Sequence, residues 1–133
     1  MKYYLDTAIW LDYFENREDR FRPLGEWALA LLSKIRADED KILVSDVVLD
    51  ELRGQNAPVQ EILRPFEECI ERIEMNKEQY EEGARISAQR GLPKGDVLHA
   101  IISRDCNGIL ISRDNHFSLL TDINRAYKPE ERV

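Results

Sequence analysis

The first fourteen residues, MKYYLDTAIWLDYF, constrain the fold most, because they join a strand to a helix with an acid at the junction. Residues 2–5 have the aromatic-rich composition of a strand and are too few to form a helix. Apolar side chains from residue 9 onward recur at helical spacing, and either Asp6 or Thr7 can cap the start of that helix. Asp6 therefore lies at the carboxyl end of a strand, where open α/β sheets bind ligands. Capping alone would also explain this acid, so the rest of the chain must decide its role.

Short apolar runs recur later in the chain. Residues 42–44 and 109–111 are continuous apolar segments, typical of strands that are covered on both faces of a parallel sheet. Residues 24–35 follow the helical template, and the alternation of strands with helices predicts a three-layer fold with a parallel central sheet. Asp114 follows its strand much as Asp6 follows the first one, so both acids should emerge at the same edge of the sheet.

The segments between and after these strands are less regular. Residues 57–70 show a helical pattern that Pro65 divides, and residues 71–75 alternate weakly, as a strand would. Residues 76–90 begin with a capping box, and a short edge strand is expected near residues 124–127. These segments extend the same alternation along the chain.

The helix expected over residues 46–54, DVVLDELRG, separates its acids by face. At about 100° per residue, Asp46, Asp50 and Arg53 share one face, whereas Glu51 falls on the apolar arc. An inward glutamate needs a partner, which is either an arginine or lysine from elsewhere in the chain or a metal ion. The helix itself supplies no such partner, so both interpretations stay open.

The helix that begins near Asp96 is apolar almost all the way round. Asp96, His99 and Ser103 share its narrow polar seam. A carboxylate in the first turn lies where the helix dipole favours the ionised form, and this is the form that binds a cation. Asp96 is therefore a further candidate ligand.

Composition limits the class of protein. A chain of 133 residues with 43% hydrophobic content suits one domain, residues 1–133. The formal charge of −7 argues against binding nucleic acid mainly through a broad basic surface, but it does not exclude a nuclease whose carboxylates collect around cations. No signal peptide opens the chain and no apolar run reaches the roughly 20 residues that cross a bilayer, so we expect a cytoplasmic protein with no membrane partner. That compartment suits Cys69 and Cys106 as free thiols.

Four segments together resemble the PIN-domain nucleases and, among them, the small VapC-type ribonuclease toxins. They are YLDTAIWLDYF with Asp6, VSDVVLDELRG with Glu51, GLPKGDVLHAII with Asp96 and ILISRDNHF with Asp114. Each segment is loose by itself, but their order and their underlying secondary structure make the set fairly specific. The resemblance covers nearly the whole chain.

This resemblance implies a three-layer α/β/α PIN-like fold, in which helices flank a parallel sheet of about five strands, and an acidic pocket that binds Mg²⁺ or Mn²⁺. Asp6, Asp96 and Asp114 would be the main metal ligands. Glu51 would complete the metal-binding cluster and would orient or deprotonate the attacking water. The substrate would be RNA, hydrolysed without a protein nucleophile. A homodimer and an antitoxin protein as partner are also implied.

Several neighbouring residues have two interpretations each. Thr7 and Ser112 could hold carboxylates or substrate, although capping explains them equally well. His99 and His116 form a weak ligand set, because they have no cysteine neighbours and poor spacing.

Three further charged residues lie near the proposed ligands in the sequence. Arg113 and Lys94 flank proposed ligands and are candidates for phosphate contacts, with solvated surface charge as the alternative. Asp12 is expected to lie at the surface.

Other classes fit less well. Phosphatases of the haloacid-dehalogenase type need a second aspartate two residues after the first, and here position 8 is alanine. Receiver domains need a late lysine, and none follows the last core strand until Lys128. The remaining alternatives are an RNA-processing PIN nuclease outside a toxin–antitoxin pair and a PIN-like binding module that does not cut; the intact set of four acids argues against the latter.

Overall fold

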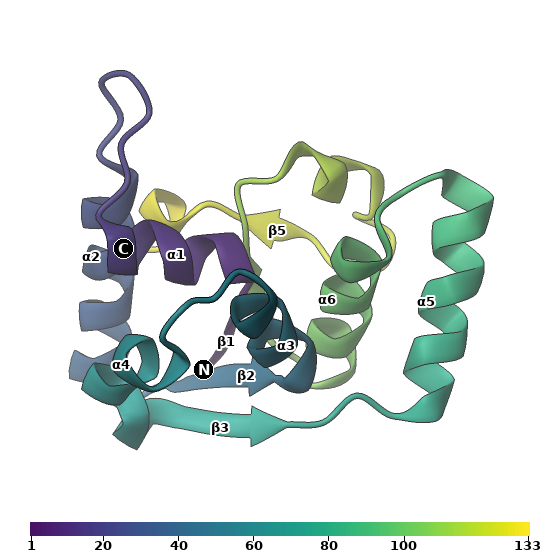
Figure 1. Ribbon diagram of the computed structural model, residues 1–133, viewed down its shortest axis with the longest axis horizontal. Helices are drawn as coiled ribbons and strands as arrows, with labels where there is room; N and C mark the ends of the chain where they lie inside the picture. Colours follow the sequence, from purple (N-terminus) through teal and green to yellow (C-terminus); the bar gives the residue numbers. More distant parts are fainter.

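The computed structural model describes residues 1–133 and is built around a five-stranded parallel sheet (Figure 1). The strand order is β3-β2-β1-β4-β5, and every neighbouring pair is parallel. The strands are β1 (Lys2–Leu5), β2 (Lys41–Ser45), β3 (Ile70–Ile73), β4 (Ile109–Ile111) and β5 (Ala126–Tyr127). The predicted α/β class with about five parallel strands is confirmed.

Six helices surround the sheet. They are α1 (Thr7–Glu15), α2 (Leu24–Ala37), α3 (Asp46–Gly54), α4 (Val59–Leu63), α5 (Lys77–Arg90) and α6 (Lys94–Asp105). Three short 3₁₀ helices complete the chain: η1 (Arg64–Cys69), η2 (Asn115–Leu119) and η3 (Pro129–Glu131). None of the helices is both long enough and apolar enough to cross a membrane.

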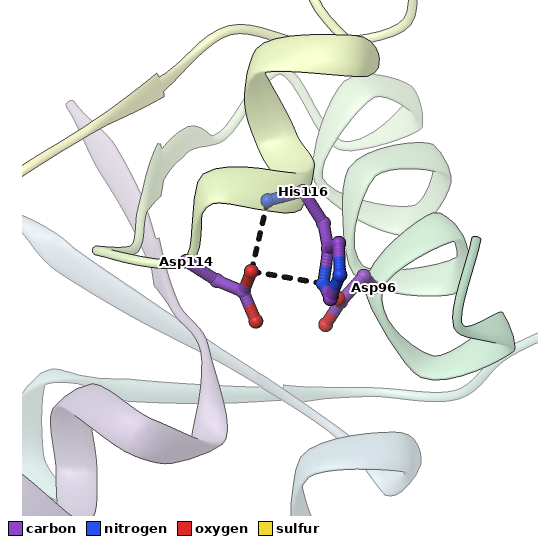
Figure 2. Close-up of side chains that lie close together, drawn as sticks. All are labelled: Asp96, Asp114 and His116. Atoms are coloured by element: carbon purple, nitrogen blue, oxygen red, sulfur yellow. Dashed lines mark hydrogen bonds and ion pairs between the residues drawn. The ribbon is translucent and has the colours of Figure 1, made fainter.

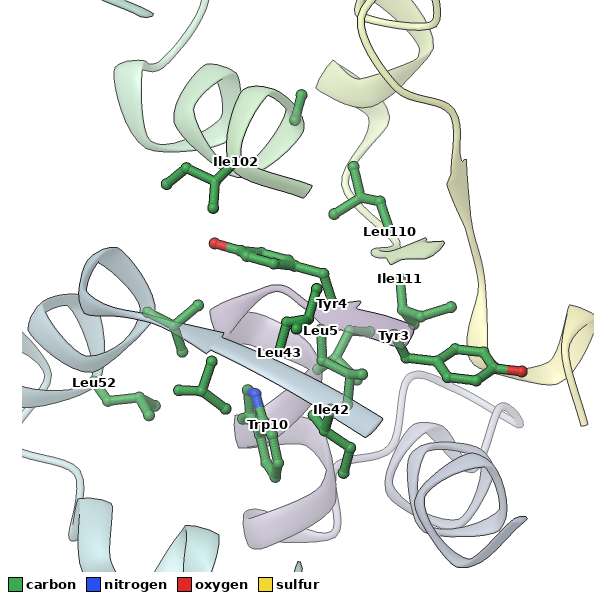
Figure 3. Close-up of a cluster of buried hydrophobic side chains, with 14 of the residues drawn as sticks. Tyr3, Tyr4, Leu5, Trp10, Ile42, Leu43, Leu52, Ile102, Leu110 and Ile111 are labelled. Carbon is green, nitrogen blue, oxygen red and sulfur yellow. The ribbon is translucent and has the colours of Figure 1, made fainter. Parts of the chain in front are cut away.

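The central strand β1 is buried on both faces, which explains its aromatic composition. Tyr3, Tyr4 and Leu5 are each at most 1% exposed. Figure 3 shows Tyr4 on the side of the sheet where Ile102 of α6 lies, and Trp10 of α1 on the other side. Because successive side chains of a strand point to opposite faces, this short segment holds both helical layers in place.

The strand order places a topological switch point at β1. The chain passes from β1 to β2 and β3 on one side, then returns to β4 and β5 on the other. The carboxyl ends of β1, β2 and β4 therefore lie at one edge of the sheet. In doubly wound sheets, ligands bind in the crevice outside the strand ends at this point.

Local signals in the sequence set the ends of several elements. Ser45 accepts a hydrogen bond from the Val48 amide at the start of α3, and Asn76 and Gln79 form the predicted capping box of α5. Pro65 divides the expected helix over residues 57–70, since α4 ends at Leu63 and a 3₁₀ helix follows. The next strand begins one residue earlier than predicted, at Ile70, because it pairs in register with Ile42 of β2.

Candidate active site

A cavity of about 310 Å³ opens at the carboxyl edge of the sheet. It is lined by Asp6, Thr7, Ala8, Leu11, Arg17, Glu51, Gln55, Asp96, His99 and Asp114. The four acids singled out in the sequence thus face one space, although they come from β1 and α1, α3, α6 and the loop after β4. Parallel pairing of the strands is what brings these distant segments together.

Asp6 is held on both of its carboxylate oxygens. Oδ1 accepts the Ile9 amide at 3.1 Å, which makes Asp6 the N-cap of α1, and Oδ2 accepts the hydroxyl of Ser112. The residue is only 5% exposed, and this burial raises its pKa to about 6, against the lowering effect of the Ser112 hydrogen bond. Capping and a role in the cavity are therefore compatible, because cap and cavity use the same fixed carboxylate.

Asp96, Asp114 and His116 lie close together (Figure 2), and Asp96 and Asp114 line the same cavity as Asp6. Nδ1 of His116 lies 2.8 Å from Asp96 Oδ2 and 2.9 Å from Asp114 Oδ1. Burial and the charge of Asp114 raise the pKa of Asp96, while the hydrogen bond to Asp96 and the charge of Asp114 raise that of His116. One nitrogen thus bridges two carboxylates that would otherwise repel each other.

These three side chains meet the spacing that a metal ion requires. One ligand atom of each lies within 4.8 Å of the others. Carboxylate oxygens are the donors that hard divalent cations prefer, and burial is the main cause of the raised pKa of both Asp96 and Asp6. The donor set therefore fits a divalent ion of the Mg²⁺ type.

The protein partners of Glu51 are Thr7 and His99 and not the arginine or lysine that was one of its two expected partners. The Thr7 hydroxyl donates to its Oε1 at 2.5 Å, and Nε2 of His99 lies 2.7 Å from the same oxygen. Burial alone would raise the pKa of Glu51, but the hydrogen bonds from His99 and Thr7 outweigh it and lower the pKa. Glu51 is therefore held ionised, and its Oε2 receives no hydrogen bond from the protein.

His99 belongs to a buried chain of hydrogen bonds that sequence reasoning left unassigned. Its Nδ1 lies 2.7 Å from the Tyr4 hydroxyl, which in turn lies 2.6 Å from Ser45 Oγ. A carboxylate only accepts, so Nε2 carries the proton that faces Glu51. The polar seam of Asp96, His99 and Ser103 on an otherwise apolar helix was the available signal, and His99 is indeed 2% exposed.

Thr7 and Ser112 are not helix caps, because Asp6 is the N-cap of α1 and Asp114 that of η2. Thr7 donates to Glu51, and Ser112 donates to Asp6 while its Oγ also accepts the Asp114 amide at 3.0 Å. Both hydroxyls orient carboxylates of the cavity. Thr7 directly follows Asp6, and Ser112 precedes Asp114 by two residues. These positions were compatible with orienting the acids, but the sequence could not distinguish this function from helix capping.

Two expectations about charged residues are wrong. Asp12 is 5% exposed, with Arg17 at 3.7 Å and Arg113 at 4.0 Å. Arg113 is not a solvated surface charge, because its side chain is 14% exposed, forms a bidentate pair with Glu130 and stacks on Trp27. The cation that does line the cavity is Arg17, which follows the end of α1 and was not among the residues singled out in the sequence.

Solved structures with the same fold include toxin–antitoxin complexes. VapBC2 from Rickettsia felis, bound to a DNA fragment from its promoter, has a TM-score of 0.71 at 21% identity, covering 96% of this chain and 98% of that one. VapBC-1 from nontypeable Haemophilus influenzae has a TM-score of 0.65 at 20% identity, with 97% and 98% covered. A toxin–antitoxin complex from Klebsiella pneumoniae has a TM-score of 0.66 at 16% identity, with 96% and 97% covered. At these identities the likeness shows the fold.

The sequence itself matches the profile of the PIN domain over residues 3–122. That span begins within β1, extends past β4 and contains all four acids of the cavity. No curated protein matches the chain.

Proposed function

The chain belongs to the PIN-domain family of nucleases, and from that premise we propose that it is a metal-dependent endoribonuclease. It would hydrolyse RNA phosphodiester bonds in the cavity that Asp6, Glu51, Asp96 and Asp114 line. The observation that carries this proposal is the convergence of four carboxylates from separate elements on one cavity at the switch point of the sheet. A structural role would not need all four to face the same space.

Asp96, Asp114 and Asp6 would hold Mg²⁺ or Mn²⁺, with Glu51 completing the acidic set. A bound divalent cation would neutralise phosphate charge and make water a better nucleophile. The protein would contribute fixed oxygens, because Ser112 holds Asp6 and the Asp114 carboxylate accepts the His116 amide at 2.8 Å. Ligands fixed in this way need little rearrangement when the cation binds.

Glu51 would orient the attacking water and accept its proton. Oε1 is fixed by Thr7 and His99, while Oε2 is left free of protein donors and can accept from water. The lowered pKa keeps this group ionised at neutral pH. Arg17 is the one guanidinium that lines the cavity, and it would exchange its ion pairs with Glu15 and Asp12 for contact with the phosphate next to the cleaved bond.

We further propose that the protein is a single PIN domain acting as the toxin of a toxin–antitoxin pair in the cytoplasm. The support is the shared fold with VapBC complexes of similar length, since the match covers 96% of this chain and 98% of the Rickettsia felis chain. An antitoxin protein would then be its inhibitor, and a homodimer its working form. Co-purification with the product of a neighbouring gene would test the antitoxin.

Cleavage of a structured RNA in Mg²⁺ or Mn²⁺ tests the nuclease mechanism. We expect the wild type to cut, and Asp6→Asn and Asp96→Asn each to lower the rate by at least about 100-fold, as loss of a metal ligand or its support typically does. The matched control is Asp50→Asn, since Asp50 is an exposed acid on the same helix as Glu51 and its side chain is 77% exposed. Equal cleavage by all four proteins would refute the mechanism.

A further inference from the structure

A second cavity of about 250 Å³ adjoins the acidic one. It lies between η2 and the β5 strand, and its polar lining includes Asn115, Ser118, Thr121, Arg125 and Lys128. Asp114 lines both cavities, so they share a wall. We call this second cavity the β5 groove.

The β5 groove offers two cations, Arg125 and Lys128, that form no salt bridge with an acid. The chain has a net charge of −7, and many of its arginine and lysine side chains form ion pairs with acids, as Arg113 does with Glu130. Arg125 instead stacks on the ring of Tyr127 at 4.9 Å, and the side chain of Lys128 forms no ion pair. Both side chains are exposed, so their charges face solvent at the groove.

The other acid in the groove, Glu131, keeps its charge but is held in place by one hydrogen bond. Glu131 accepts the backbone amide of Lys128 at 3.0 Å, which closes the turn of η3. Hydroxyl and amide groups of Ser118, Thr121 and Asn115 are exposed around it. Cations combined with neutral donors suit phosphate and ribose oxygens, because both accept hydrogen bonds.

We propose that the β5 groove binds the phosphate backbone of the RNA strand next to the bond that is cut. This inference rests on the proposed function. A strand whose scissile phosphate lies among the four acids must leave that cavity, and the wall formed by Asp114 leads directly to Arg125 and Lys128. The groove thereby supplies the attraction that the acids themselves deny to a polyanion.

An acidic peptide is the other ligand that two free cations could attract. Peptide docking usually depends on apolar anchors in desolvated pockets, and the groove offers none. Its hydrophobic lining is Ala126 and Phe117, and Phe117 is 2% exposed. The lining therefore favours a backbone of phosphates and sugars.

The test compares two double variants with equal loss of charge. Arg125→Ala/Lys128→Ala removes the cations of the groove, and Arg64→Ala/Lys41→Ala removes an exposed arginine and lysine elsewhere. Lys41 is the first residue of β2, so it lies at the amino-terminal end of the parallel strands, away from the cavities. Arg64 lies in the 3₁₀ helix that leads into β3. Thermal melting of each variant shows that it is folded.

Binding is measured by fluorescence anisotropy with a labelled single-stranded RNA of about 12 nucleotides, within the site sizes of single-strand-binding domains. Ca²⁺ replaces Mg²⁺, a gel shows that the RNA stays intact, and the salt concentration is varied. Each lost phosphate contact reduces the slope of log K against log salt by about 0.7, so the groove variant should lose about 1.4 and bind on the order of 10-fold more weakly. Arg125→Lys should keep most of the slope, and the control should match the wild type.

A wild-type slope in the groove variant would overturn the proposal. So would a variant that binds RNA normally but has lost affinity for poly-glutamate, because the groove would then be a site for an acidic peptide. Cleavage is read separately. If the groove variant binds RNA more weakly but the wild type cuts nothing, the groove is supported and only the proposed nuclease activity is refuted. If the variant cuts RNA with an unchanged KM, only the groove is refuted.

Discussion

Nε2 of His99 lies 2.7 Å from Oε1 of Glu51, and both residues belong to helices that only the tertiary fold brings together. The imidazole is fixed at its other nitrogen by the Tyr4 hydroxyl at 2.7 Å. The orientation of a solvent-facing carboxylate is thus set from the interior of the protein. His99 is a positioning residue for Glu51.

Replacing His99 should therefore separate turnover from binding. In His99→Leu, Glu51 keeps only the Thr7 hydroxyl, and we expect kcat to fall by about 10- to 100-fold, the range found for loss of an orienting hydrogen bond. KM for RNA should change little, because His99 is buried beneath the cavity. His99→Gln can still donate an amide N–H to Glu51 and should recover part of the loss. A rise in KM with constant kcat would contradict this role.

Gly95 should be as sensitive a position as the acids themselves. A Cβ atom at Gly95 would lie 2.6 Å from Oε2 of Glu51, so Gly95→Ala must displace the carboxylate. Alanine is a better helix former than glycine by up to about 1 kcal/mol, so the melting temperature should hold or rise while cleavage falls by about 10-fold or more. Gly54→Ala, at the end of the same helix as Glu51, meets nothing within 4 Å and should retain activity. Full activity of Gly95→Ala would show that the position of Glu51 is not critical.

The acids could be predicted from sequence because their positions follow from local rules. Asp6 comes directly after β1, Asp114 comes three residues after the end of β4, and Asp96 lies in the first turn of its helix. Parallel pairing then brings such positions to one edge regardless of the loops between them. The short β5 strand was also expected, although its two residues carry little pattern of their own.

The hydrogen-bond partners could not be predicted, because they depend on distances between segments. The Tyr4 hydroxyl pairs with Ser45, 41 residues away along the chain, and with His99, 95 residues away. Nothing in the local sequence says that these polar atoms face one another. Asp12 illustrates the same limit, since its burial results from the packing of Arg17 and Arg113 above it.

Metal-free protein should become more stable when Asp6 is replaced by asparagine. The folded pKa of about 6 exceeds the ordinary value of 3.8, so the folded state binds the proton more tightly and the stability of the wild type falls as pH rises between these values. At pH above 6 the full penalty applies, and Asp6→Asn should raise the free energy of unfolding by up to about 3 kcal/mol, at about 1.4 kcal/mol per pKa unit. The Asn side chain still accepts the Ile9 amide.

Chemical denaturation with EDTA at several pH values measures this difference. The gap between Asp6→Asn and wild type should close as pH falls toward 4, and saturating Mg²⁺ should stabilise the wild type more than the variant. Asp50→Asn, which alters an exposed acid, should leave stability unchanged at every pH. A variant less stable than wild type at pH 8 without metal would show that the charge of Asp6 is compensated by the protein.

His116 should compete with the metal ion, because its Nδ1 bridges Asp96 and Asp114 where a cation would bind them. The raised pKa means that the imidazole is protonated more readily than an ordinary histidine, so bound Mg²⁺ must displace that charge. An unperturbed histidine of pKa about 6.5 would already weaken binding by about 4-fold at pH 6, and a raised pKa increases the factor. We therefore expect His116→Ala to bind Mg²⁺ at least about 4-fold more tightly than wild type near pH 6, with the difference shrinking toward pH 8.

Isothermal titration calorimetry in buffers of different ionisation enthalpy measures both the affinity and the protons released. The variant should release fewer protons per Mg²⁺ than the wild type near pH 6, since one competing group is gone. Leu119→Ala, which alters an exposed side chain of the same 3₁₀ helix, is the control and should behave as wild type. If His116 instead donates its nitrogen to the metal, His116→Ala will lose affinity at every pH, and Mn²⁺ binding will suffer more than Mg²⁺ binding because imidazole suits the softer ion.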